Sequence, residues 1–262
     1  MKLEIISKQP SSGNGHAPLL FIHGMLHGAW CWDAHFLGYF AQHGYPAYAV
    51  NLRGHGNSEG RERLRWTRIA DFADDVADAV RQLPHSPVLI GHSMGGFIIQ
   101  KYLQTAIAPG AVLLSSPSPN GLVGTALSIA GRHPMLFAKM NATFSLRPLI
   151  ATPQLAREAF LSEDLPEDQL LSYWSRMEEE SYAALLDMVA LDLPDPAKVK
   201  TPLLVLGVER DNMLRRSDIE ATARAYNTEF EIVPGVAHDS MIEQRWENVA
   251  DRILDWLNER AL

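Results

Sequence analysis

Residues 87–96 read Pro87-Val88-Leu89-Ile90-Gly91-His92-Ser93-Met94-Gly95-Gly96, and this stretch decides the fold. Its apolar start predicts a buried strand, and residues 97–103 predict a helix directly after it. A serine at such a sharp strand-to-helix turn has a strained backbone, so only small residues fit two positions to either side, where Gly91 and Gly95 stand. The turn would raise the Ser93 hydroxyl above the sheet edge, beside a helix N-terminus that favours negative charge.

Short apolar runs alternate with helical patterns on both sides of this turn. The predicted strands are residues 3–6, 19–22, 45–50, 87–90, 111–114, 203–206 and 230–233, and the predicted helices are 33–43, 67–83, 97–103, 217–226 and 246–259. Thr67 is the predicted N-cap of the second helix, and Gly44 follows the end of the first. This alternation is typical of an α/β fold whose mostly parallel sheet is covered by helices on both faces.

The alternation stops after residue 119. Residues 120–194 show helical spacing and no convincing strand, and the strand pattern resumes at residue 203. We therefore predict a single domain over residues 1–262, with residues 120–194 inserted as a helical cap. An insertion at this point would lie above the C-terminal ends of the strands, where open α/β sheets keep their sites.

A serine hydroxyl becomes a good nucleophile only when a base takes its proton and a third group holds that base. Asp211 and His238 each follow a predicted strand closely, as Ser93 does, so the three side chains can meet at one sheet edge. Their order along the chain is Ser, Asp, His. Glu209 and Asp239 compete with Asp211 for the acidic role.

Three further histidines lie near the predicted site. His23, His55 and His92 precede or flank glycine turns, and we interpret them as braces for loops.

A tetrahedral oxyanion needs two N–H donors. One is predicted to be the backbone N–H of Met94, the residue after the nucleophile. The other is predicted to come from Met25, in the loop after the strand 19–22, where Gly24 allows close approach of the backbone.

Composition excludes several classes of function. The net charge of −8 argues against a nucleic-acid partner, because such a surface must be basic. Cys31 is the only cysteine, so neither an intrachain disulfide nor a thiolate metal site is expected. The N-terminus does not resemble a signal peptide, and no stretch has the roughly 20 apolar residues of a membrane span. These features predict a cytoplasmic protein without a membrane span, a metal or a cofactor, and they leave monomer and homodimer open.

The chain resembles the α/β-hydrolase superfamily over nearly its full length. The resemblance rests on His23-Gly24 with Ala29-Trp30-x-Trp32, the loop Leu52-Arg53-Gly54-His55-Gly56-x-Ser58, the turn Gly91 to Gly96, Gly207 to Asp211, and Gly235 to Asp239. Residues 23–32 are also similar to plant esterase and hydroxynitrile-lyase relatives, and the 52–58 loop to lysophospholipase and monoglyceride-lipase relatives. The resemblance implies an eight-stranded sheet, a cap inserted after the sixth strand, and hydrolysis of esters through an acyl-enzyme.

We therefore predict a serine esterase for a medium-sized apolar acyl substrate, with Ser93, His238 and Asp211 as the triad. The same residues could cleave a thioester, an amide or a C–C bond, and the sequence does not separate these. A lyase usually depends on a lysine or similar cation near the site, and Lys139 is the lone lysine of the cap. A non-catalytic binding protein on the same fold is the third alternative, against which the intact triad argues.

Overall fold

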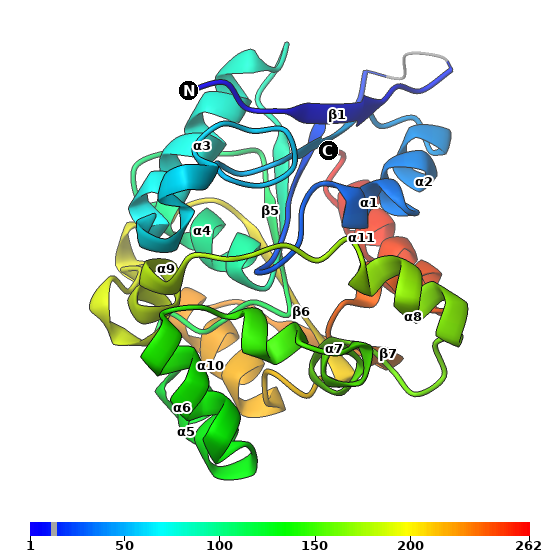
Figure 1. Cartoon of the computed structure of the whole chain (residues 1–262). Coiled ribbons are helices and arrows are strands. Elements are labelled where there is room, and N and C mark those ends of the chain that lie inside the picture. The colour runs from blue at the N-terminus through cyan, green and yellow to red at the C-terminus, as the bar shows by residue number, and fades with distance from the viewer. Residues whose placement is uncertain (12–14) are drawn as a thin grey trace.

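The computed structural model describes residues 1–11 and 15–262, which form one sheet with helices packed around it (Figure 1). The strand order is β1-β3-β2-β4-β5-β6-β7, with β1 antiparallel to β3 and every other pair parallel. The strands are β1 Ile5–Lys8, β2 Leu19–Ile22, β3 Ala47–Val50, β4 Val88–His92, β5 Ala111–Leu114, β6 Leu203–Arg210 and β7 Phe230–Ala237. Strands β2, β4 and β5 are buried along their whole length, as apolar runs in a sheet covered on both faces should be.

The predicted fold class is confirmed, but the expected strand count is wrong. Within residues 1–11 and 15–262 the sheet has seven strands rather than eight. The described residues before β2 supply a single strand, β1, so the sheet has one strand fewer than the resemblance implies. For the same reason the insertion follows the fifth strand and not the sixth.

Helices cover both faces of the sheet. The helices α3 (Ile69–Gln82), α4 (Met94–Tyr102) and α10 (Arg216–Tyr226) lie on one face, and α1 (Trp30–Asp33), α2 (Phe36–Gln42) and α11 (Trp246–Glu259) lie on the other (Figure 1). Short 3-10 helices at Arg61–Trp66, Arg147–Ile150, Pro196–Lys198 and Ser240–Ile242 complete the connections. The buried apolar side chains form two clusters, one on each side of the sheet.

The first predicted helix differs from the structure. The pattern over residues 33–43 is in fact two helices, α1 and α2, because the backbone of His35 leaves the helical region at φ −144° and ψ −54°. Gly44 follows α2 with φ +93°, as a residue after a helix end often does.

Thr67 does not cap α3, which begins at Ile69. Its first N–H donates instead to Oδ2 of the buried Asp187 at 3.0 Å, and Arg68 Nε donates to the same oxygen at 2.7 Å. A carboxylate from a distant part of the chain thus accepts from the first N–H of α3, while the local Asp71 accepts from the N–H of Arg68 at 2.8 Å.

Strands β6 and β7 extend further than the sequence pattern indicates. They continue to pair with each other through residues 207–210 and up to Ala237, with an irregular register between Val208 and Arg210. As a result Asp211 and His238 come immediately after strand ends, whereas the predicted strands end at residues 206 and 233.

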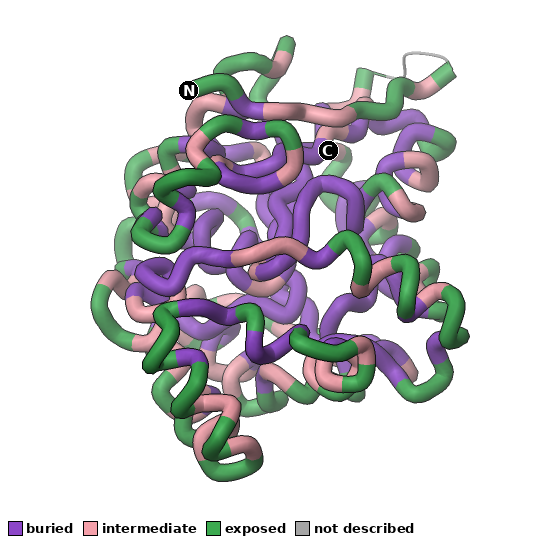
Figure 2. Tube along the Cα trace, viewed as in Figure 1, coloured by how far each residue is buried: buried purple, intermediate pink, exposed green. Residues whose placement is uncertain are grey.

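The inserted segment, residues 120–194, contains helices and no strand in the structure, which describes all of its residues. Its elements are α5 Val123–Arg132, α6 Pro134–Thr143, α7 Pro153–Phe160, α8 Glu167–Trp174, α9 Tyr182–Leu186 and a π-helical turn Asp187–Leu191, besides the 3-10 helix at Arg147–Ile150. In Figure 1 the helices α5, α6 and α7 lie at the end of the molecule opposite β1. Figure 2 shows that α5 and α6 are more exposed than the sheet. No helix in the described part of the chain is long and apolar enough to cross a membrane.

Candidate active site

Ser93 lies in the turn between β4 and α4 with φ +51° and ψ −121°, a conformation that costs free energy for any residue with a side chain. Its N–H donates to the carbonyl of Leu114 on the neighbouring strand at 2.9 Å. A Cβ atom on Gly91 would lie 2.6 Å from the backbone of Gly95, and one on Gly95 would collide with the carbonyl of Ile22. The two glycines are therefore required by close packing of the backbone around the turn.

His238 contacts both Ser93 and Asp211. Its Nε2 lies 3.0 Å from Ser93 Oγ, and its Nδ1 lies 2.9 Å from Asp211 Oδ2. A carboxylate can only accept, so Nδ1 carries the proton and Nε2 is free to accept from the hydroxyl. The other oxygen of Asp211 accepts from the N–H groups of Met213 and Leu214, each at 2.8 Å, which fixes the plane of the carboxylate.

The rival acids lie elsewhere. Glu209 accepts from the N–H of Gly235 at 2.8 Å in an exposed position. Asp239 is fully buried, and its Oδ2 lies 3.0 Å from Nε2 of His27. Of the three acids considered from the sequence, the structure brings Asp211 onto His238.

The pKa of His238 has two opposing influences. Burial is the largest single influence and lowers it, because a buried imidazolium loses its hydration, whereas the charge and the hydrogen bond of Asp211 raise it. Asp239 also raises the pKa and His27 lowers it, and the net shift is upward from the ordinary value.

The three loop histidines all contact the backbone. His92 Nε2 donates to the carbonyl of His238 at 2.9 Å, and burial, followed by the charge of His238, lowers the pKa of His92 to about 3. His23 Nε2 accepts from Leu52 N–H at 3.2 Å, which leaves its Nδ1 to donate to the Gly24 carbonyl at 2.9 Å. His55 lies 3.2 Å from the Arg53 carbonyl and from Glu180.

The two predicted oxyanion donors have unused N–H groups. Met94 is the first residue of α4, so its N–H has no partner within the helix. The N–H of Met25 donates no hydrogen bond to any residue that the structure describes. A Cβ atom on Gly24 would lie 3.1 Å from the Cβ of Ser93, which shows how closely this loop passes the serine.

A cavity of about 170 Å³ opens beside Ser93 and His238. Most of its lining comes from the inserted segment, including Ala126 on α5 and Phe137 and Met140 on α6. None of the described residues that line it is a lysine or an arginine. Lys139 lines two outward-facing grooves instead, away from the serine.

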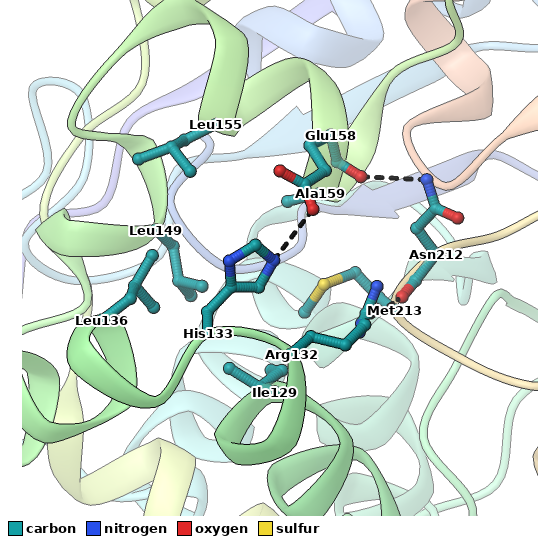
Figure 3. A pocket seen from close by; sticks show the side chains of 10 residues that line it. All are labelled: Ile129, Arg132, His133, Leu136, Leu149, Leu155, Glu158, Ala159, Asn212 and Met213. Carbon is teal, nitrogen blue, oxygen red and sulfur yellow. Dashed lines mark hydrogen bonds and ion pairs between the residues drawn. The ribbon is translucent and has the colours of Figure 1, made fainter.

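A smaller cavity of about 30 Å³ lies between the inserted segment and the loop that carries Asp211 (Figure 3). Here Asn212 Nδ2 donates to the carbonyl of Glu158 at 2.9 Å, and Arg132 donates to the carbonyl of Asn212 at 3.1 Å. The Glu158 side chain in turn pairs with His133 at 2.8 Å. These contacts hold the residue next to Asp211 against α5 and α7.

His92, His238 and Asp239 come within 4.8 Å of one another, the spacing of metal ligands. Their atoms already have other neighbours, because both nitrogens of His238 face Ser93 and Asp211, and Asp239 faces His27. The cluster is better explained as part of the site around Ser93 than as a metal centre.

Comparison with known proteins identifies the class. Residues 19–252 match the model of the alpha/beta hydrolase family, so the chain belongs to that family. A monoacylglycerol lipase of Mycolicibacterium smegmatis is 28% identical over 238 residues, which are 83% of this chain and 80% of that protein.

Solved structures show the same fold. A protein of Mycobacterium tuberculosis described as a non-heme bromoperoxidase aligns with a TM-score of 0.78 at 21% identity, over 99% of this chain and 97% of its own. An esterase of Thermogutta terrifontis aligns with a TM-score of 0.70 at 21% identity, over 98% of this chain and 93% of the esterase chain.

Proposed function

We propose that the protein is a carboxylic-ester hydrolase that works through an acyl-enzyme on Ser93. The observation that carries the proposal is the continuous contact from Ser93 Oγ through His238 to Asp211, at 3.0 and 2.9 Å, beside an apolar cavity. The relative named monoacylglycerol lipase supports an ester as the substrate.

The proposed steps use the contacts described above. Ser93 Oγ attacks the ester carbonyl while His238 Nε2 takes its proton, and Asp211 stabilises the resulting imidazolium. The N–H groups of Met25 and Met94 bind the oxyanion. The intermediate collapses, and the leaving alkoxide takes the proton from His238. Water then gives a proton to His238 and its oxygen to the acyl carbon. The bond between the acyl carbon and Ser93 Oγ breaks as His238 returns the proton to Oγ, which releases the acid and restores Ser93.

We propose that the inserted segment acts as the cap over this site and that the whole chain forms one domain. Its side chains supply most of the apolar wall of the cavity and thereby exclude water from the reacting atoms. The lack of a cation among the described residues of that wall favours hydrolysis over the lyase alternative. Thioester, amide and C–C cleavage use the same triad, and a panel of acyl-CoA thioesters, anilides and aryl esters separates them.

The size of the cavity sets an expected acyl length. A cavity of about 170 Å³ is close to the roughly 150 Å³ that holds a benzene molecule. In a p-nitrophenyl ester series we expect kcat/KM to rise about fourfold per carbon, since each buried methylene contributes about 0.8 kcal/mol, up to about six carbons and then to fall. A profile that declines from acetate onward would contradict a cavity that receives the acyl chain.

One substitution tests this assignment of the cavity. Ala126→Phe fills the cavity from α5 and is expected to move the best substrate to a shorter acyl chain. The matched control is Ala138→Phe. Ala138 lies exposed on the next helix, α6, so this change is expected to leave the acyl-length profile unchanged. Equal profiles for the two variants would show that the acyl group binds elsewhere.

The raised pKa of His238 predicts the acid limb of the pH profile. The base must be neutral to accept the serine proton, so kcat/KM should fall as pH drops through this pKa. Because the carboxylates of Asp211 and Asp239 together outweigh burial, we expect a midpoint above the ordinary histidine value of about 6.5. A titration of kcat/KM with a short-chain aryl ester measures it. A midpoint below the ordinary value would mean that burial dominates and that the Asp211 contact is weak.

A further inference from the structure

A second buried pair of histidine and aspartate lies behind the triad and has no part in the mechanism above. His27 and Asp239 are 1% and 0% exposed, and His27 Nε2 lies 3.0 Å from Asp239 Oδ2. The contact has the distance of an ion pair, without the alignment of a hydrogen bond. The His27 ring also stacks on Trp30, with centroids 5.3 Å apart, so its plane is fixed.

His27 reaches the loop of the oxyanion donor with its other nitrogen. Its Nδ1 lies 2.7 Å from the carbonyl oxygen of Met25, and since a carbonyl only accepts, Nδ1 must donate. Burial is the largest single influence on the pKa of His27 and lowers it, but Asp239, the Met25 carbonyl and Glu180 together raise it above its ordinary value. When both nitrogens are protonated, the ring has one N–H toward the Met25 carbonyl and one toward Asp239.

The Met25–Leu26 peptide is held at both of its polar ends. Its carbonyl accepts from His27, and its N–H, which belongs to Leu26, donates to Glu180 Oε2 at 3.1 Å. Leu26 has φ +66°, an uncommon conformation for a residue with a side chain, which the chain adopts only when surrounding contacts require it. The preceding peptide, which carries the Met25 N–H, is held by His23 through the Gly24 carbonyl.

We propose that His27, paired with Asp239, is a positioning residue that keeps the Met25 N–H directed at the oxyanion. Asp239 directly follows His238 in the chain. The pair therefore ties the loop of the oxyanion donor to the turn of the base, so that both keep their places relative to Ser93. This inference rests on the proposed ester hydrolysis. It adds a group that touches neither the substrate nor the triad side chains.

Two double variants separate positioning from structural support. In His27→Asn the amide nitrogen occupies the place of Nδ1 and can still donate to the Met25 carbonyl. In His27→Gln the amide lies near the place of Nε2 and cannot donate to the Met25 carbonyl. Each is combined with Asp239→Asn, so that no buried charge is left alone. The control is His43→Gln, because His43 Nδ1 also contacts a backbone carbonyl, that of Tyr39 at 2.9 Å, at an exposed position.

The readouts are kcat and KM for p-nitrophenyl butyrate, together with thermal unfolding. We expect His27→Gln/Asp239→Asn to lose about 100-fold in kcat, as a misplacement of about 1 Å can cause, with KM changed less than about twofold. His27→Asn/Asp239→Asn should lose less than about tenfold in kcat, and His43→Gln should leave kcat unchanged. Equal kcat losses in the two double variants, or an effect confined to KM or to thermal stability, would overturn the proposal.

A crystal structure of the glutamine variant tests the same claim without activity. We expect the Met25 N–H to point away from Ser93 there and to keep its direction in the asparagine variant; a Met25 N–H unchanged in both would overturn the proposal. If the wild-type protein hydrolyses no ester, the proposed function fails and these two structures still decide the positioning. If the glutamine variant does not fold, the asparagine variant decides it, because a loss of about 100-fold there would contradict a role for Nδ1.

Discussion

Replacing Ser93 with alanine is expected to lower ester turnover about 10⁶-fold while the fold stays intact. The alanine leaves no atom to attack the carbonyl, and His238 then has no hydroxyl to deprotonate at its Nε2. Only the contribution of the oxyanion donors and of binding should survive, roughly 10³–10⁴ over the reaction in water. The measurement is kcat for p-nitrophenyl butyrate at enzyme concentrations high enough to detect the residual rate.

The chain offers a matched control for this variant. Ser115 is another buried serine with positive φ, at +43°, and it directly follows the neighbouring strand β5. Ser115→Ala should therefore reproduce any general effect of losing a strained serine at a strand end, without a comparable loss of turnover. Turnover close to wild type in folded Ser93→Ala protein would contradict the mechanism.

Asp211→Asn is expected to cost about 10⁴ in turnover. Asp211 Oδ1 accepts from two backbone N–H groups, so the oxygen of an asparagine will keep that place and its NH₂ group will face His238. An NH₂ group donates, which forces Nδ1 of His238 to accept and moves the ring proton to Nε2. The ring then presents an N–H to Ser93 and cannot take the serine proton.

Glu209→Gln is the matched control for the acid. Glu209 carries the same charge two residues earlier, but it contacts the backbone of Gly235 rather than His238. We expect it to cost far less than Asp211→Asn in the same kcat assay. A larger loss from Glu209→Gln would mean that the acid is assigned to the wrong residue.

Local signals explain why the strand-to-helix turn was predictable. The apolar run before Ser93, its flanking glycines and the helical pattern after it all lie within seventeen residues, 87–103. The positions of Asp211 and His238 could also be predicted, because parallel strands end at a common edge and each residue follows a strand.

Long-range contacts explain what the sequence could not reveal. The first N–H of α3 donates to Asp187, 118 residues beyond Ile69, and no local pattern predicts this partner, although Asp71 caps the preceding residue locally. The pairing of His27 with Asp239 joins opposite ends of the chain in the same way. Its one sequence signal is the His238-Asp239 dipeptide, in which Asp239 was considered only as a rival for the acid.

The lining of the cavity was beyond prediction for another reason. Helical periodicity indicates that a helix has an apolar face, but not which neighbour that face meets. On α6, Phe137 and Met140 line the cavity beside Ser93, while Met135 is 83% exposed. Only the packing of the inserted segment separates these side chains.

The central claim is that an acyl-enzyme forms on Ser93, and trapping that intermediate tests it most directly. Wild-type protein is mixed with p-nitrophenyl hexanoate, quenched in acid within milliseconds, digested and analysed by mass spectrometry, with Ser93→Ala treated identically. We expect a hexanoyl group on the peptide that contains Ser93 in the wild type and on no peptide in the variant. A hexanoyl group that persists in Ser93→Ala, or that lies on another residue of the wild type, would contradict the account.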